Sequence, residues 1–270
     1  MQRRQLLKGV GVLSTTALAG CEGRLIGEPT MATDFSDSYP VSPETKVAIS
    51  NRNGPVTVHP TDNDQLQILG SKQANSQSGL DSIDIEVITG ERFVINVRFA
   101  AGSDFANRSV DLDIGIPTGV NVDIVNTANG DVTVRGVRGD VNATTVNGTV
   151  QLQDISGFVR GSSTNGNVTV QNCTGITGAR TTNGSVEVDI LAMRENVHCQ
   201  SSNGNVVARV GPDISAAIRL STNTGTAQVQ DLSYTTTVSK QGYIVGSLRG
   251  GQTPLLFLGT NNGDVTLKPI

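Results

Sequence analysis

The sequence predicts an all-β protein built on a parallel β-solenoid of short coils, of about 18 to 20 residues each, preceded by antiparallel β-strands. Three observations support this fold class: a motif that recurs at a near-constant spacing, hydrophobic columns in register with it, and an unusual composition. The chain holds 31 Gly, no Trp and only 3% aromatic residues, and it is rich in Val, Thr and Asn. Such a composition disfavours a helical bundle and favours many short strands joined by tight turns.

The recurring motif is an Asn-Gly pair between alternating hydrophobic residues. It occurs first as TANGDVTV at residues 127–134, and then as TVNGTVQL, STNGNVTV and TTNGSVEV. A single Asn-Gly pair indicates a hairpin, but a period near 20 residues is typical of a solenoid. Successive motif glycines are 18, 18, 18, 20, 21 and then 38 residues apart, the last step being about two coils: Gly130, Gly148, Gly166, Gly184, Gly204, Gly225 and Gly263.

Hydrophobic residues keep the same register from one repeat to the next. In a parallel stack each residue lies about 4.8 Å from its equivalent in the next coil, so equal shapes pack on each other. An antiparallel meander is the alternative, but it would not require one residue type in each column. The main columns are Val132, Val150, Val168, Val186 and Val206, then Val134, Leu152, Val170 and Val188, and then the small residues Ala143, Gly161, Ala179 and Cys199.

The asparagines of the motif form a further column. Asn tolerates the left-handed backbone of a tight turn, and Gly adopts it freely. Stacked amides can also hydrogen-bond to one another along a stack of strands. We therefore interpret the column as a structural ladder, with a row of ligand-binding amides as the alternative. Its members are Asn129, Asn147, Asn165, Asn183, Asn203 and Asn262.

The N-terminal segment has the features of an export signal. Residues 1–20 combine Arg3 and Arg4 in the string RRQLLK with a short apolar run that ends in LAGC. A charged start, an apolar stretch and small residues before a cleavage site are typical of such signals, and the string resembles a twin-arginine signal. LAGC resembles a lipobox, which implies a lipid attached to Cys21. An ordinary signal that ends in a chance Cys is the alternative, and residues 21–45 have the composition of a flexible tether.

The remaining chain divides into two regions. Residues 46–125 read as antiparallel strands that cap one end of the rod, and residues 126–270 as the β-solenoid. The string NRNGPVTV at residues 51–58 resembles an early copy of the repeat. We expect the last coil to end the rod, where Lys268 and Pro269 would blunt its open edge.

The sequence predicts no catalytic residue, no metal site and no cofactor. His59 and His198 lack further ligands at a suitable spacing. A net charge of −4 gives no basic footprint for a nucleic acid. Hydrolysis of a glycosidic bond would need paired carboxylates. The candidate carboxylates alternate with apolar residues, so we expect them to lie on the solvent-exposed face of a sheet. These candidates are Asp111 with Asp113, and Asp81, Asp84 and Glu86.

Two questions stay open at the level of sequence. Cys173 and Cys199 fall in core columns, where each is expected to act as a small hydrophobic residue, although export would permit a disulfide between them. Among six Asn-X-Ser/Thr sequons, only Asn107 lies in an irregular loop where a glycan is plausible.

The stretch SVDLDIGIPTGVNVDIVNTANGDVTVRGVRGDV, followed by repeated Asn-Gly-x-Val coils, carries a family resemblance. It resembles the putative-adhesin β-strand-repeat family of exported envelope proteins, over about residues 46–268. The resemblance implies a right-handed parallel β-solenoid in the cell envelope and supplies no catalytic residues.

We therefore expect a non-catalytic β-solenoid, anchored by lipid to the outer face of the cell membrane, that serves as an adhesin or as another binding or structural module. Its expected partner is a surface protein or a polysaccharide. The alternatives are an envelope carbohydrate-active enzyme on a β-helix, and an envelope sensor or assembly partner.

Overall fold

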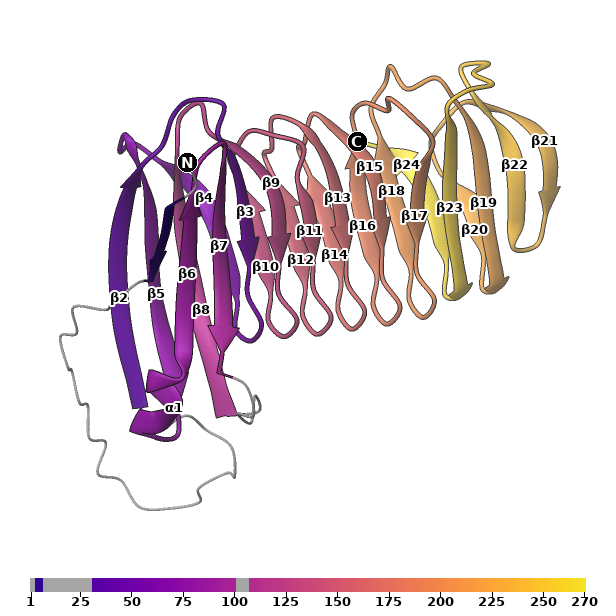
Figure 1. Cartoon of the computed structure of the whole chain (residues 1–270). Helices are drawn as coiled ribbons and strands as arrows, with labels where there is room; N and C mark the ends of the chain where they lie inside the picture. Colours follow the sequence, from indigo (N-terminus) through magenta and orange to yellow (C-terminus); the bar gives the residue numbers. More distant parts are fainter. Residues whose placement is uncertain (1–2, 7–30, 101–106) are drawn as a thin grey trace.

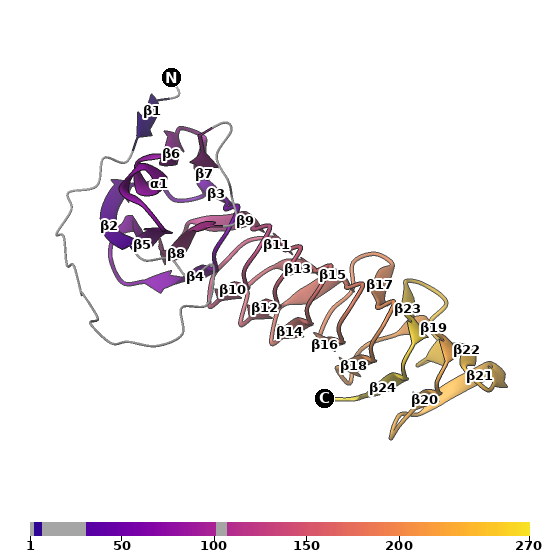
Figure 2. The same ribbon diagram turned by 90° about the horizontal axis from the view of Figure 1, so that it is seen from below.

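Two long β-sheets face each other along a rod, which widens at its N-terminal end (Figures 1 and 2). The structure is a computed structural model, and it describes residues 3–6, 31–100 and 107–270. Sheet A has 13 strands and sheet B has 11. Figure 2, seen from below, shows the strands of the two sheets as two rows, with the core between them.

Across each sheet, neighbouring strands follow an order that differs from their order along the chain. Sheet A runs β1 (Arg3–Leu6), β6 (Ile83–Thr89), β7 (Arg92–Phe99), β3 (Lys46–Ser50), β9 (Asn121–Asn126), β11 (Asn142–Thr144), β13 (Phe158–Ser162), β15 (Gly175–Arg180), β17 (Val197–Gln200), β23 (Leu255–Asn262), β19 (Ala216–Thr224), β22 (Tyr243–Leu248) and β21 (Tyr234–Lys240). Sheet B runs β2 (Met31–Pro40), β5 (Gln65–Ala74), β8 (Arg108–Pro117), β4 (Val56–Thr61), β10 (Val132–Arg135), β12 (Val150–Gln153), β14 (Val168–Gln171), β16 (Val186–Ile190), β18 (Val206–Val210), β24 (Val265–Pro269) and β20 (Ala227–Val229). A short helix, α1 (Gln77–Asp81), precedes β6.

The central part of the rod is a parallel solenoid, as predicted. Each coil gives one strand to each sheet, and strands of successive coils pair in parallel. The first predicted column pairs residue for residue from Val132 to Val206. Its valines are fully buried, so the core is a stack of equal aliphatic side chains between the sheets.

The column of small residues follows from the thinness of this core. A Cβ atom added at Gly161 would lie 2.7 Å from Cγ1 of Val168, which comes from the opposite sheet. The neighbours of Gly161 across sheet A are Ala143 and Ala179, each at most 2% exposed. Small residues on one sheet therefore make room for the valines of the other.

The parallel stack begins earlier than residue 126. Strands β3 and β4 form a coil of their own, since β3 pairs in parallel with β9 and β4 pairs in parallel with β10. The early motif copy takes part in this coil, and Asn53 bridges to Asn129. Strands β5 to β8 are inserted after the coil and cover its outer side, where β6 pairs antiparallel with β7, and β5 pairs antiparallel with β8 and β2.

The C-terminal coil does not end the rod, so that prediction was wrong. Strand β24 lies between β18 and β20, and β23 lies between β17 and β19. Pro269 accordingly pairs with Val210 inside sheet B instead of blunting an edge. The chain first builds β19 and β20, continues into the antiparallel pair β21–β22, and then returns to fill the gap (Figure 2).

Candidate binding surface

One corner of the rod carries the ladder of asparagines, and the predicted side chains do stack there. Each Nδ2 donates a hydrogen bond to Oδ1 of the preceding rung, over distances between 2.6 Å, from Asn147 to Asn129, and 2.9 Å, from Asn203 to Asn183. The ladder crosses the chain return, because Asn262 donates to Asn203 over 2.7 Å. All these amides are exposed. Each amide inside the row both donates to one neighbour and accepts from the other, so the ladder links the coils along the rod.

The outer face of sheet A carries a second row, which crosses five neighbouring strands near the C-terminal end. It contains His198 on β17 and then alternates aromatic ring and cation: Phe257 on β23, Arg219 on β19, Tyr243 on β22 and Lys240 on β21. We call these five residues the aromatic–cation row. The ring of Phe257 lies 5.7 Å from the His198 ring and 5.6 Å from the Arg219 guanidinium. The Tyr243 ring lies 5.4 Å from both Arg219 and Lys240.

Two glycines shape the surface around this row. A Cβ atom at Gly259 would lie 2.8 Å from Cζ of Phe257, so the Phe257 ring lies across the strand where Gly259 leaves room. Gly178 stands between Arg160 and His198 in the register of sheet A, and the Arg160 guanidinium lies over it, since a Cβ atom there would be 3.5 Å from Nη1 of Arg160. Arg160 and Arg180, both exposed, continue the positive charge toward the middle of the rod.

The charge on this face is not neutralised by neighbouring carboxylates. The strands of sheet A from β11 to β21 contain no Asp or Glu. Within the described residues, Arg160, Arg180, Arg219 and Lys240 form no ion pair. On the outer face of sheet B, by contrast, Arg209 binds Asp189 and Glu187 over 2.6 and 2.5 Å.

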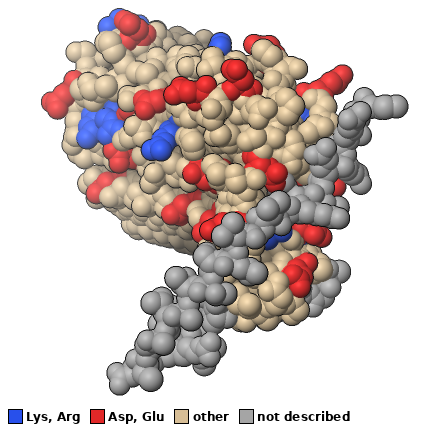
Figure 3. Space-filling view, turned by 90° about the vertical axis from the view of Figure 1, so that its left-hand side faces the viewer, with Lys and Arg blue, Asp and Glu red and all other residues tan. Residues whose placement is uncertain are grey.

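The opposite end of the molecule is acidic. Residues 31–126 hold 13 Asp and Glu against 6 Lys and Arg, a net charge of −7, whereas residues 127–270 hold 9 against 10, a net charge of +1. Figure 3 shows the N-terminal end, where acidic side chains predominate over basic ones. The aromatic–cation row thus lies in the half of the rod that repels an anion least.

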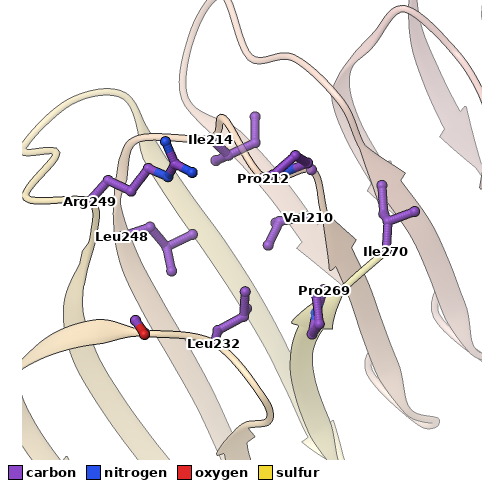
Figure 4. A pocket seen from close by; sticks show the side chains of 10 residues that line it. Val210, Pro212, Ile214, Leu232, Leu248, Arg249, Pro269 and Ile270 are labelled. Atoms are coloured by element: carbon purple, nitrogen blue, oxygen red, sulfur yellow. The ribbon is translucent and has the colours of Figure 1, made fainter.

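A hollow of about 360 Å³ opens beside the C-terminal coil (Figure 4). Its walls are mainly apolar and include Val210, Leu232, Leu248 and Ile270. The charged group at its rim is Arg249, which is 59% exposed and lies 3.8 Å from Asp213. The hollow offers apolar contact and few polar groups that could orient a ligand.

Four of the five carboxylates considered from the sequence have a local partner, and one of these, Asp81, accepts a hydrogen bond from Gln77. Asp111 accepts a hydrogen bond from Gln73, and burial raises its pKa. Asp113 lies 2.8 Å from Nε2 of His59, and Glu86 lies 2.7 Å from Arg98. Within the described part of the chain, no three His, Cys, Asp or Glu side chains group as metal ligands.

The two core cysteines are buried free thiols. Burial raises the pKa of Cys173 to about 11 and that of Cys199 to about 12, so both are protonated at neutral pH. Each therefore serves as a small hydrophobic residue of the core.

The predicted export signal falls mainly outside the described residues, and Cys21 is among those not described. Arg3 and Arg4 belong to β1, which pairs antiparallel with β6. Part of the predicted export signal therefore pairs with the fold instead of lying apart from it. Among the described residues, no helix is long and apolar enough to cross a membrane.

The sequence does not single out the aromatic–cation row. Phe257 and Arg219 are 38 residues apart, about two coils in the repeat, yet the chain return makes their strands neighbours. The available signal was the placement of Phe257 and Arg219 at outward positions of alternating strands. That signal could identify surface residues, but not which of them meet.

With the geometry described, the known relatives can be compared. The Toastrack DUF4097 family matches residues 45–268. The chain belongs to this family. No curated protein matches the chain.

Solved structures similar to this Toastrack chain include a putative adhesin from Bacteroides fragilis, at 13% identity and a TM-score of 0.41, covering 90% of this chain and 99% of that one. A putative cell adhesion protein from Clostridium sporogenes is similar at 9% identity and a TM-score of 0.36, covering 88% of this chain and 100% of that one.

Proposed function

We propose that this Toastrack chain is a non-catalytic binding module, displayed outside the cell and held to the membrane by a lipid on Cys21. The observation that carries the proposal is that the attachment end and the aromatic–cation row lie at opposite ends of the rod. Strand β2, which begins at Met31 and follows residue 21 in the chain, lies at one end of the rod, and the aromatic–cation row lies toward the other (Figure 1). Ten strand spacings separate β2 from β20 in sheet B, which at about 4.8 Å each gives roughly 48 Å. An anchor before β2 would therefore present the row well away from the lipid.

The rigidity of the rod supports the same role. Backbone ladders in both sheets and the amide ladder at the corner join each coil to the next. A module that must hold a surface at a distance benefits from such stiffness, since less conformational entropy is lost when the surface binds.

The anchor is tested by changing Cys21→Ala in the full chain and fractionating the cells. The unchanged protein should be found with the membrane and be digested when protease is added to intact cells. The variant should leave the membrane fraction, whereas Ser14→Ala, in the same segment, should not. A Cys21→Ala variant that stays in the membrane would refute the lipid anchor.

The absence of catalysis is tested separately. The purified chain is incubated with neutral and acidic polysaccharides, and new chain ends are assayed. Polymer turnover would overturn the proposal and favour a carbohydrate-active enzyme.

A second candidate, an assembly partner, has one observation in its favour. Strand β21 is the last strand of sheet A, and its residues from Thr235 to Lys240 are all exposed. An exposed edge can accept a strand from another molecule. Sedimentation over a range of concentrations tests self-assembly, and a monomer at every concentration counts against it.

A further inference from the structure

We propose that the aromatic–cation row, together with Arg160 and Arg180, is a binding site for an acidic polysaccharide. The inference rests on the proposed role as a binding module, and it names the face and the chemical class of the ligand. It does not depend on the lipid anchor.

The first argument is the position of the aromatic rings. Between residues 127 and 270 the chain has four aromatic residues, while the core there is built from Val, Ile, Leu, Ala and Cys. Phe257 and Tyr243 lie on the outer face of sheet A and are only half-buried. They fill no space between the sheets, so the part of each ring that Arg219, Lys240 and the strand leave uncovered can contact a partner. The C–H faces of sugar rings pack on such surfaces, because the face of an aromatic ring is electronegative.

The second argument is the alternation of rings and cations. His198, Phe257, Arg219, Tyr243 and Lys240 stand on five successive strands. Four strand spacings of about 4.8 Å give the row a length of roughly 19 Å along the rod. A linear polymer lying along the rod would meet a ring and a cation in turn from β23 to β21. A chain of sugar rings that carry carboxylates presents these two features in the same alternation.

The third argument is the state of the cations. Arg219 lies within 6 Å of two ring centres, a distance at which a cation is attracted to the ring face. The rings thus hold the guanidinium in place, while no carboxylate of the described chain occupies its donors. A guanidinium binds a carboxylate through two parallel hydrogen bonds. The Arg219 guanidinium is thus already positioned, and free of a carboxylate partner in the described chain, to bind a carboxylate of the ligand.

The charge of the whole protein narrows the class of ligand. The N-terminal end is strongly acidic, and the chain as a whole carries −4. A nucleic acid long enough to extend past the row would be repelled by the acidic N-terminal end, because its charge density is high. A polysaccharide has its charges spaced by sugar rings, and it would gain from the aromatic contacts as well.

The test measures binding of the full chain to polygalacturonate, with neutral dextran and single-stranded DNA as comparison polymers. We expect polygalacturonate to bind, more weakly at high salt because the exposed charges are screened, and dextran and DNA to bind far less. Arg219→Gln should weaken binding about tenfold or more, since a charge-assisted pair is lost. Phe257→Leu should weaken it several-fold through loss of ring stacking.

The matched control is Arg135→Gln, which removes one exposed arginine from the outer face of sheet B. It should leave binding within about twofold of the unchanged protein. Arg180→Gln repeats the charge test on another strand in case Arg219→Gln does not fold, and far-UV circular dichroism checks each variant.

Three results would overturn the inference: no binding of polygalacturonate, equal binding of DNA, or an equal loss for Arg135→Gln and Arg219→Gln. None of these results bears on surface display or on the absence of catalysis, which have their own tests.

Discussion

The glycine of each Asn-Gly motif should be among the least replaceable residues of the rod, and Gly166→Ala tests this. Gly166 has φ +153°, and a Cβ atom there would lie 2.0 Å from the backbone oxygen of Gly148 in the preceding coil. Real Cβ atoms are essentially never found within 3.0 Å of another atom. The obstacle is backbone, so the alanine can be accommodated only if the two coils move apart.

The cost follows from what holds those coils together. Gly148 N donates to Asn165 O, and Val150 N donates to Asn167 O, both over 2.9 Å. A displacement of about 1 Å breaks both bonds, at about 0.5–1.5 kcal/mol each. The backbone conformation, unfavourable for alanine, adds about 1–3 kcal/mol. We expect Gly166→Ala to lower the free energy of unfolding by about 4 kcal/mol.

Gly250→Ala is the matched control. Gly250 also has a positive φ, +70°, but a Cβ atom there would have no neighbour within 4 Å. Its cost is then only that of the left-handed conformation, about 1–2 kcal/mol. Urea unfolding followed by far-UV circular dichroism measures both variants. Equal losses of stability in the two would show that the contact between coils is not what requires glycine.

Two further predictions concern the ladder and the buried thiols. Asn165→Ala removes side-chain hydrogen bonds to Asn147 and from Asn183, so the free energy of unfolding should fall by about 1–2 kcal/mol; an unchanged urea midpoint would mean that the exposed ladder adds no stability. Cys173 and Cys199 should not react with a thiol reagent at pH 8 in the folded protein, because their raised pKa values of about 11 and 12 keep them protonated and burial blocks access. Both should react in urea, and rapid labelling of the native chain would contradict this burial.

The repeated part of the fold could be predicted because each coil repeats the same physical requirement. The position of Val132 predicts that of Val150, and the position of Gly130 predicts that of Gly148, because equivalent residues of successive coils lie beside each other. The antiparallel strands at the N-terminal end were predicted, but the order of the coils in space at the two ends was not, for the opposite reason. At each end the chain leaves the stack, forms antiparallel strands and comes back beside an earlier coil, and the spacing of the motif along the chain does not encode the order of coils in space.

The candidate surface shows the same limit. The outward position of His198 follows from the alternation in its strand, where Val197 and Cys199 are buried. Its contact with Phe257 depends on the return of residues 255–262 between two coils already formed. A site that is assembled by such a return can be found only when the strand order is known.

That return also sets the order in which the molecule can be completed. Strands β19 and β20 have no neighbouring coil on their inner side until residues 255–269, which come later in the chain, take their place between β17–β18 and β19–β20. A nascent chain that lacks those residues can stack its coils only as far as β18, with its C-terminal cap undocked. The rod therefore cannot finish forming from one end to the other while it is being synthesised.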